Sequence, residues 1–173
     1  MMMFSDKPEK RLGAIRFLAR TAVIAALYAV LTIFMAPIAY GPLQFRLAEA
    51  MTIFPLFFPE AILGLTIGCL IANVFSAFGW YDMVFGTAAT LIAAILTYLI
   101  SKSSLAVKKP KLLPFIGAIP PVVVNALLLP LIWYFFASDA GYLINMLMIF
   151  GTQSAVIYLL GIPLYFGLKK VKL

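Results

Sequence analysis

The sequence has no histidine, a single cysteine (Cys69) and only six acidic residues in 173. Without histidine the chain cannot build the catalytic triads in which imidazole is the base, nor the usual zinc sites. One cysteine cannot form a disulfide within the chain. The Gly-x-x-x-x-Gly-Lys-Ser/Thr loop that holds nucleotide phosphates is also missing. We therefore expect no catalytic residues, no metal and no cofactor, and any use of ATP would need a partner.

Charge is scarce as well. Charged residues make up 11% of the chain, whereas soluble domains average about 25%. Hydrophobic residues make up 65%, and the mean hydropathy is +1.10. A particle of this size still exposes about a third of its surface, so this apolar surplus must face lipid. The sequence predicts an all-α integral membrane protein, with one domain over residues 1–173.

Five uncharged stretches of 19 to 29 residues are long enough to cross a bilayer. They are Thr21–Ala39, Ala61–Tyr81, Met83–Ser101, Leu112–Ser138 and Ala140–Leu168. After the turn signal Gly41-Pro42, a sixth helix at about 45–58 carries Arg46 and Glu49. It is too short to face lipid alone and must pack among the others. We predict a bundle of six transmembrane helices over residues 16–168.

The basic residues indicate the orientation of this bundle. With six spans, 12 of the 13 Lys and Arg fall on one side: in the N-terminal arm (1–15) and the start of the first span, in Lys102–Lys111, and in the C-terminal tail (169–173). Only Arg46 falls elsewhere. Because cytoplasmic segments carry the excess of Lys and Arg, we expect both termini in the cytoplasm. The net charge of +7 is then explained by insertion into the lipid bilayer, with no nucleic acid partner.

The short helix holds the first candidate ligand-binding residues. Gln44 precedes it, and Arg46 and Glu49 share one helix face because they are three residues apart. A carboxylate there could accept two parallel hydrogen bonds from adjacent N–H donors of a ligand. The alternative is a salt bridge at the membrane surface, with Arg46 extended to the headgroups.

Two further acids are expected near the same membrane face. Asp82 follows Gly79-Trp80-Tyr81, so Trp80 and Asp82 could line a site, or Asp82 could cap the next helix. Trp and Tyr also anchor helices at membrane interfaces. Asp139 is better explained as a loop or capping residue.

Three amides lie within the predicted spans and should point inward, because an unpaired amide in lipid is costly. They are Asn73, Asn125 and Gln153. Single amides commonly serve helix packing. Three of them on three helices, below an acidic mouth, indicate a polar pocket.

Small residues repeat at four-residue spacing in Ala22 and Ala26, in Ala25 and Ala29, and in Gly64 and Gly68. Such stripes let helices approach closely, either inside the bundle or against a partner.

Four segments resemble the QueT family, the queuosine-precursor substrate-binding subunits (S components) of energy-coupling factor (ECF) transporters. They are Ala25–Thr32 (AALYAVLT), Tyr40–Ala50 (YGPLQFRLAEA), Gly64–Asn73 (GLTIGCLIAN) and Asp82–Thr90 (DMVFGTAAT). The motifs and their order match through roughly residues 20–100.

The resemblance implies a six-helix S component that binds a 7-deazaguanine precursor from outside. It would dock on a transmembrane coupling protein and two ATP-binding cassette ATPases, and ATP hydrolysis there would reorient it in the bilayer. The alanine stripe of the first helix is the docking face of S components, which assigns Ala22, Ala26 and Ala29 to partner contact. The chain departs from the family at Gln153, where a glutamate is usual, and at Pro130, which interrupts the fifth span.

The substrate-binding residues predicted in this way are Gln44, Arg46, Glu49, Asn73, Trp80, Asp82, Asn125 and Gln153. Two alternatives remain open within the sequence. The S component could take another vitamin or nucleobase-like ligand, since a neutral Gln153 suits an uncharged molecule. The chain could instead be a small intramembrane lipid-modifying enzyme, with Glu49 or Asp82 as its acid or base. A self-sufficient channel or proton-coupled carrier would need a chain of buried charges, which is missing.

Overall fold

The computed structural model describes residues 8–40, 43–76, 78–136 and 140–171, and all regular structure within them is helical. Four apolar helices are long enough to cross a membrane: Glu9–Phe34, Asp82–Lys102, Leu113–Phe136 and Tyr142–Lys170. Two shorter apolar helices, Leu47–Leu56 and Glu60–Asn73, lie among them. The prediction of an all-α, multi-pass membrane protein is confirmed. The count of six crossings and the side of the termini stay predictions.

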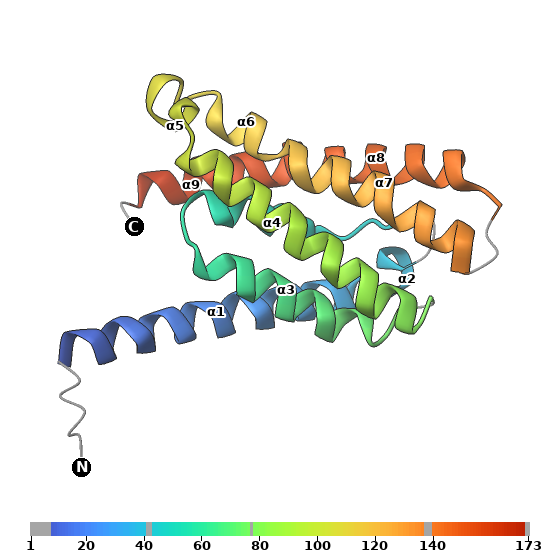
Figure 1. Cartoon of the computed structure of the whole chain (residues 1–173), viewed down its shortest axis with the longest axis horizontal. Coiled ribbons are helices and arrows are strands. Elements are labelled where there is room, and N and C mark those ends of the chain that lie inside the picture. Colours follow the sequence, from blue (N-terminus) through green and yellow to red (C-terminus); the bar gives the residue numbers. More distant parts are fainter. Residues whose placement is uncertain (1–7, 41–42, 77, 137–139, 172–173) are drawn as a thin grey trace, which may run out of the picture.

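The chain begins with α1 (Pro8–Phe34), which runs along the long axis and projects beyond the other helices at its N-terminal end (Figure 1). Its first turns, residues 9–20, are exposed. The apolar stretch expected as Thr21–Ala39 is divided, because the helix ends at Phe34 and the short α2 (Ala36–Ala39) follows.

The central element is η1 (Leu47–Leu56), a 3-10 helix in contact with α1, α3, α4, α6, α8, η3 and α9. Its residues are buried except Leu47 and Phe54, which are partly buried. A 3-10 helix rises about 2.0 Å per residue, so ten residues extend roughly 20 Å, further than an α-helix of that length. Side chains three residues apart line up in this geometry, which places Arg46, Glu49 and Thr52 along one side.

The third helix is shorter than the sequence suggested. α3 (Glu60–Asn73) stops at Asn73 rather than Tyr81, and the chain turns before η2 (Asp82–Gly86) and α4 (Thr87–Lys102). Hydropathy hides this turn because it contains Val74 and Phe75. Gly79 has a φ of +60°, a left-handed conformation that glycine adopts without steric cost.

α1 and α3 pack with almost no space between their backbones. A methyl group built on Gly68 would lie 2.7 Å from the carbonyl oxygen of Ala25, and one on Gly64 would lie 2.8 Å from Ile24. Ala25 and Ala29 are buried, each 5% exposed, whereas Ala22 and Ala26 face outward. The two alanine stripes therefore lie on adjacent faces of α1, one exposed and one buried, and Ala29, which the resemblance assigns to partner contact, lies on the buried one.

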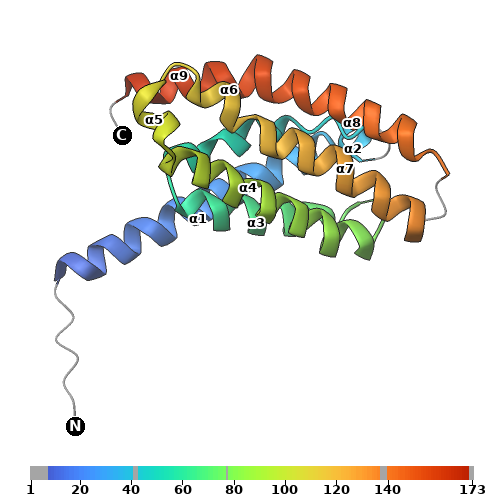
Figure 2. The same ribbon diagram turned by 45° about the horizontal axis from the view of Figure 1, so that its top comes forward.

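The second half of the chain packs over α4 and η1 (Figure 2). It comprises α5 (Ser104–Lys108), α6 (Leu113–Gly117), α7 (Ile119–Phe136), α8 (Tyr142–Val156), η3 (Ile157–Gly161) and α9 (Ile162–Lys170). Pro130 does not interrupt the fifth span, because α7 continues through it to Phe136. The proline is buried, so packing against neighbouring helices offsets its lost backbone bond.

The basic residues gather at one end of the molecule, where α1 begins, α5 lies and α9 ends (Figure 1). At this end Arg20 bonds Glu60 at 2.9 Å and joins α1 to the start of α3. Arg46 is the exception and lies in the interior, 3% exposed.

Candidate ligand-binding site

A cluster of polar side chains is buried at the start of η1, between α1, α3, η2, α7 and α8. In a chain this apolar, each of these groups must find a partner inside the protein or a ligand, because lipid offers none. The members of this polar cluster are Tyr28, Gln44, Arg46, Glu49, Cys69, Asn73, Asp82, Trp133 and Gln153, each 5% exposed or less.

Glu49 lies on η1 and is 2% exposed. The Tyr28 hydroxyl on α1 donates to its Oε1 at 2.5 Å, and the side chain of Gln153 on α8 lies near the carboxylate. Its second oxygen, Oε2, is buried and has no partner. The carboxylate is therefore held on one side and free on the other.

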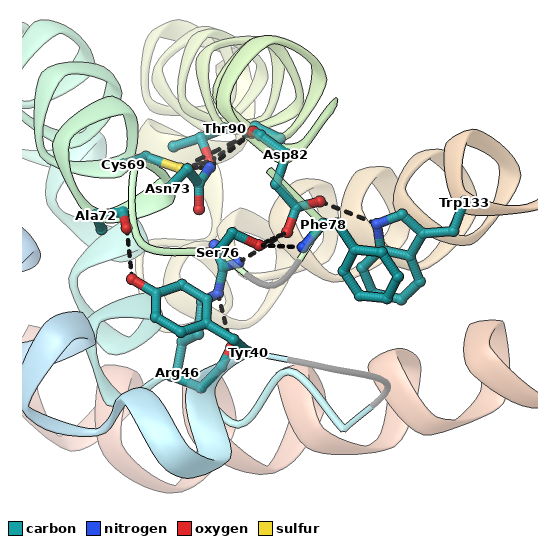
Figure 3. A network of polar contacts seen from close by, with 12 residues as sticks. Tyr40, Arg46, Cys69, Ala72, Asn73, Ser76, Phe78, Asp82, Thr90 and Trp133 are labelled. Atoms are coloured by element: carbon teal, nitrogen blue, oxygen red, sulfur yellow. Dashed lines mark hydrogen bonds and ion pairs between the residues drawn. The ribbon is translucent and has the colours of Figure 1, made fainter. Parts of the chain in front are cut away.

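Asp82 lies in η2 and is 1% exposed. Trp133 on α7 donates from Nε1 to Oδ1 at 2.9 Å, and the Ser76 hydroxyl donates to Oδ2 at 2.5 Å (Figure 3). The Arg46 guanidinium lies 3.8 Å from the same oxygen. Asp82 thus ties the start of η1 to the α3–η2 turn and to α7, and its carboxylate belongs to the cluster rather than to a helix cap.

Arg46 makes two further contacts that fix it in place. Its Nε donates to the carbonyl of Ala39 at 3.1 Å, and its guanidinium lies 5.5 Å from the Tyr40 ring centre. The Tyr40 hydroxyl in turn donates to the carbonyl of Ala72 at 2.5 Å. The alternative of a salt bridge between Arg46 and Glu49 at the membrane surface is wrong, because Arg46 is interior and pairs with Asp82.

Asn73 ends α3 and is fully buried. Its amide nitrogen donates to the backbone carbonyl of Asp82 at 2.9 Å and contacts the Cys69 sulfur at 3.2 Å. A carbonyl accepts only from a donor, so this bond fixes which way the amide faces. The side-chain oxygen of Asn73 is left buried without a partner, as is that of Gln153.

Gln44 combines backbone strain with unmet hydrogen bonding. It has a φ of +48°, which is uncommon for a residue with a side chain, and it is 1% exposed. The backbone on each side is held, since the Leu43 carbonyl accepts from Thr152 and the Phe45 N–H donates to Ile38. Both polar atoms of its amide are buried without a partner. Unusual conformations of this kind cluster at ligand sites.

Six of the eight residues predicted from the sequence belong to this polar cluster: Gln44, Arg46, Glu49, Asn73, Asp82 and Gln153. Asn125 is also buried, on α7. Trp80 is not in the cluster; it is 55% exposed and lies against Tyr81, with ring centres 4.1 Å apart. Asp139 lies outside the described residues.

Two aromatic residues of the cluster escaped sequence reasoning. Tyr28 lies within an apolar span, where a phenol hydroxyl is easily taken for an ordinary interfacial group. Trp133 is fully buried and stacks on Phe78, with ring centres 4.2 Å apart and planes 12° apart. A buried indole N–H needs a hydrogen-bond acceptor, and the Asp82 carboxylate supplies it. The spacing of the two residues in the sequence could not predict this contact, because they lie on different helices.

The described helices are those of a multi-pass membrane protein that buries a cluster of polar side chains in its interior. The sequence matches the model of the family described as QueT transporter over residues 18–170, and the chain belongs to this family. The resemblance to this family seen in the sequence is confirmed.

Among curated proteins, the chain is similar to "Queuosine precursor transporter QueT" of Lactococcus lactis subsp. cremoris (strain MG1363). The two are 41% identical over 73 residues, which cover 41% of this chain and 43% of the relative. The match thus spans less than half of that protein's length. No solved structure matches the chain.

Proposed function

We propose that this protein is the substrate-binding subunit of an ATP-driven ECF-type importer, and that it takes up a queuosine precursor of the 7-deazaguanine type. Membership of the QueT transporter family and the name of the similar Lactococcus protein support the ligand. The missing nucleotide-binding loop supports a partner that hydrolyses ATP.

The observation that carries the proposal is a set of buried polar atoms without partners. They are both amide atoms of Gln44, Oε2 of Glu49, and the side-chain oxygens of Asn73 and Gln153. Leaving one such atom unpaired costs about 1–3 kcal/mol. Five of them on four side chains of one cluster are hard to explain as packing, and a ligand that pairs with them recovers that cost.

The chemistry of these atoms favours a ligand rich in N–H donors. Glu49, Asn73 and Gln153 each offer an acceptor, and Gln44 offers one acceptor and one donor. A 7-deazaguanine ring presents a ring N–H beside an exocyclic amine, and a carbonyl that could accept from the Gln44 amide. Glu49 is the residue proposed to bind the two adjacent N–H donors, because an ionised carboxylate can accept a hydrogen bond from both.

The proposed docking face lies on the outer side of α1. Ala22 and Ala26 are exposed there, and Val23, Leu27 and Val30 beside them are 50–63% exposed. Small residues on an exposed helix face let a second helix approach closely. We assign this face to the coupling protein and exclude Ala29, which is buried against the protein's own interior.

Two measurements test this function. The purified chain should bind the aminomethyl, cyano and unsubstituted forms of 7-deazaguanine more tightly than it binds riboflavin. Binding can be measured as a change in tryptophan fluorescence, to which the buried Trp133 contributes. Failure to bind any purine-like base would contradict the ligand. Affinity purification from native membranes should also recover two ATPases and a larger membrane protein, and recovery of the chain alone would contradict the ECF assignment.

A further inference from the structure

We infer that Tyr28 is a positioning residue for the ligand: its hydroxyl fixes the orientation of the Glu49 carboxylate and thereby sets discrimination between bases with and without a 2-amino group. This inference rests on the proposed function of the site. Tyr28 is not a ligand contact in this account, since its hydroxyl is already used by Glu49.

The position of Tyr28 is fixed by the helices around it. It is fully buried on α1, and its backbone passes so close to α3 that a methyl group on Gly68 would lie 2.8 Å from its Cβ. Its carbonyl accepts from the Thr32 hydroxyl at 2.8 Å. The phenol ring therefore has little freedom, and its hydroxyl is presented to η1 from a rigid support.

The hydroxyl meets one oxygen of Glu49 and leaves the other free. It donates to Oε1, whereas Oε2 has no partner. A carboxylate has about four acceptor positions, so Oε1 keeps one when Tyr28 occupies another. The free edge of the carboxylate is thus held at one angle, able to receive two parallel donors from a ligand.

A carboxylate fixed in this way distinguishes two donors from one. A base with a ring N–H beside a 2-amino group fills both acceptor positions, whereas a base without the amino group leaves one buried oxygen unpaired. Without the Tyr28 hydroxyl, the Glu49 side chain can rotate toward whichever donor is present. Discrimination should then fall, even though Glu49 itself is unchanged.

The test compares 7-deazaguanine with 7-deazahypoxanthine, which lacks only the 2-amino group, by calorimetric titration of the purified chain. Tyr28→Phe should weaken binding of 7-deazaguanine about tenfold or more, because a hydrogen bond to a charged group is lost. Binding of 7-deazahypoxanthine should change much less, so the ratio of the two affinities narrows. The matched control is Tyr158→Phe, which removes a hydroxyl that donates to the Phe115 carbonyl, and it should leave both affinities unchanged.

A second comparison separates positioning from packing. In a Glu49→Gln background, Tyr28→Phe should have no further effect on 7-deazaguanine binding, because Tyr28 acts through the carboxylate. Three results would each overturn the inference and leave the proposed function standing. They are an equal loss of affinity for both bases, additive effects of the two substitutions on affinity, and a Tyr28→Phe protein that does not fold. Failure of the unmodified chain to bind either base would instead refute the proposed function and this inference with it.

Discussion

The guanidinium of Arg46 lies 3.8 Å from the carboxylate of Asp82, with side chains 4% and 1% exposed. The two residues come from different parts of the chain, the residue before η1 and the first residue of η2. Their pairing joins the entry of the central 3-10 helix to the turn that follows α3. Removing one partner of such a buried pair costs folding free energy, because the remaining charge stays buried without an opposite charge or water around it.

Asp82→Asn should therefore destabilise the protein by about 3–5 kcal/mol, measured by thermal or denaturant unfolding in detergent. The asparagine keeps an acceptor for Trp133 but leaves Arg46 unpaired. The matched control is Glu60→Gln in the ion pair between Arg20 and Glu60, where the Arg20 side chain is 50% exposed. That change should cost about 1 kcal/mol or less. Similar losses for the two variants would mean that Arg46 and Asp82 are not a critical buried pair.

The glycines of α3 should prove necessary for its contact with α1. A methyl group at position 68 would meet the Ala25 backbone carbonyl at 2.7 Å, and backbone cannot move aside as a side chain can. Gly68→Ala should destabilise the protein by about 1–3 kcal/mol through overpacking.

Gly151→Ala serves as the control, since it lies in α8 with no atom within 4 Å of the new methyl group. It should be neutral or stabilising by up to about 1 kcal/mol, because alanine favours helix. A Gly68→Ala protein as stable as the parent would show that α1 and α3 can separate without loss.

The expected topology can be tested by labelling single cysteines in whole cells. In a Cys69→Ala background, a cysteine at Lys109 should resist a membrane-impermeant maleimide, because the basic end of the bundle is expected in the cytoplasm. A cysteine at Ala140, exposed between α7 and α8, should react from outside. Labelling of position 109 together with protection of position 140 would show that the protein has the opposite orientation in the membrane.

The outward face of α1 should be needed for uptake but not for binding. Ala22→Trp or Ala26→Trp should leave ligand affinity unchanged and abolish transport, because an indole there holds a partner helix away. Ala88→Trp, at an exposed alanine of α4, is the matched control and should transport normally. Loss of binding in the α1 variants would show that this face serves internal packing.

Much of the fold could be predicted from hydropathy and charge, because lipid imposes long apolar helices and water-exposed basic ends. The end of α3 could not, since Val74 and Phe75 continue the apolar pattern through a turn. The form of η1 also escaped prediction: its ten residues make a 3-10 helix whose longer rise suits a buried crossing.

The site was predictable to the extent that polar residues in an apolar chain must point inward. Glu49, Asn73 and Gln153 do lie in the interior, as expected. The spacing of Arg46 and Glu49 left a salt bridge between them as an alternative, whereas the ion pair in the structure joins Arg46 to Asp82. Trp80 was singled out because it is close to Asp82 in the sequence, whereas the tryptophan that bonds Asp82 is Trp133. A role of Trp80 in ligand binding stays a prediction.

The central claim is that Glu49 accepts hydrogen bonds from two adjacent donors of a 7-deazaguanine ligand. Calorimetric titration of the parent and Glu49→Gln proteins with this ligand tests the claim most directly. The substitution is nearly isosteric, but an amide has one acceptor atom and turns a donor toward the ligand's donor. We expect the parent to bind and the variant to bind about 30- to 1000-fold more weakly, equivalent to about 2–4 kcal/mol. Binding within about threefold of the parent would contradict the account and make Asp82 the next carboxylate to test.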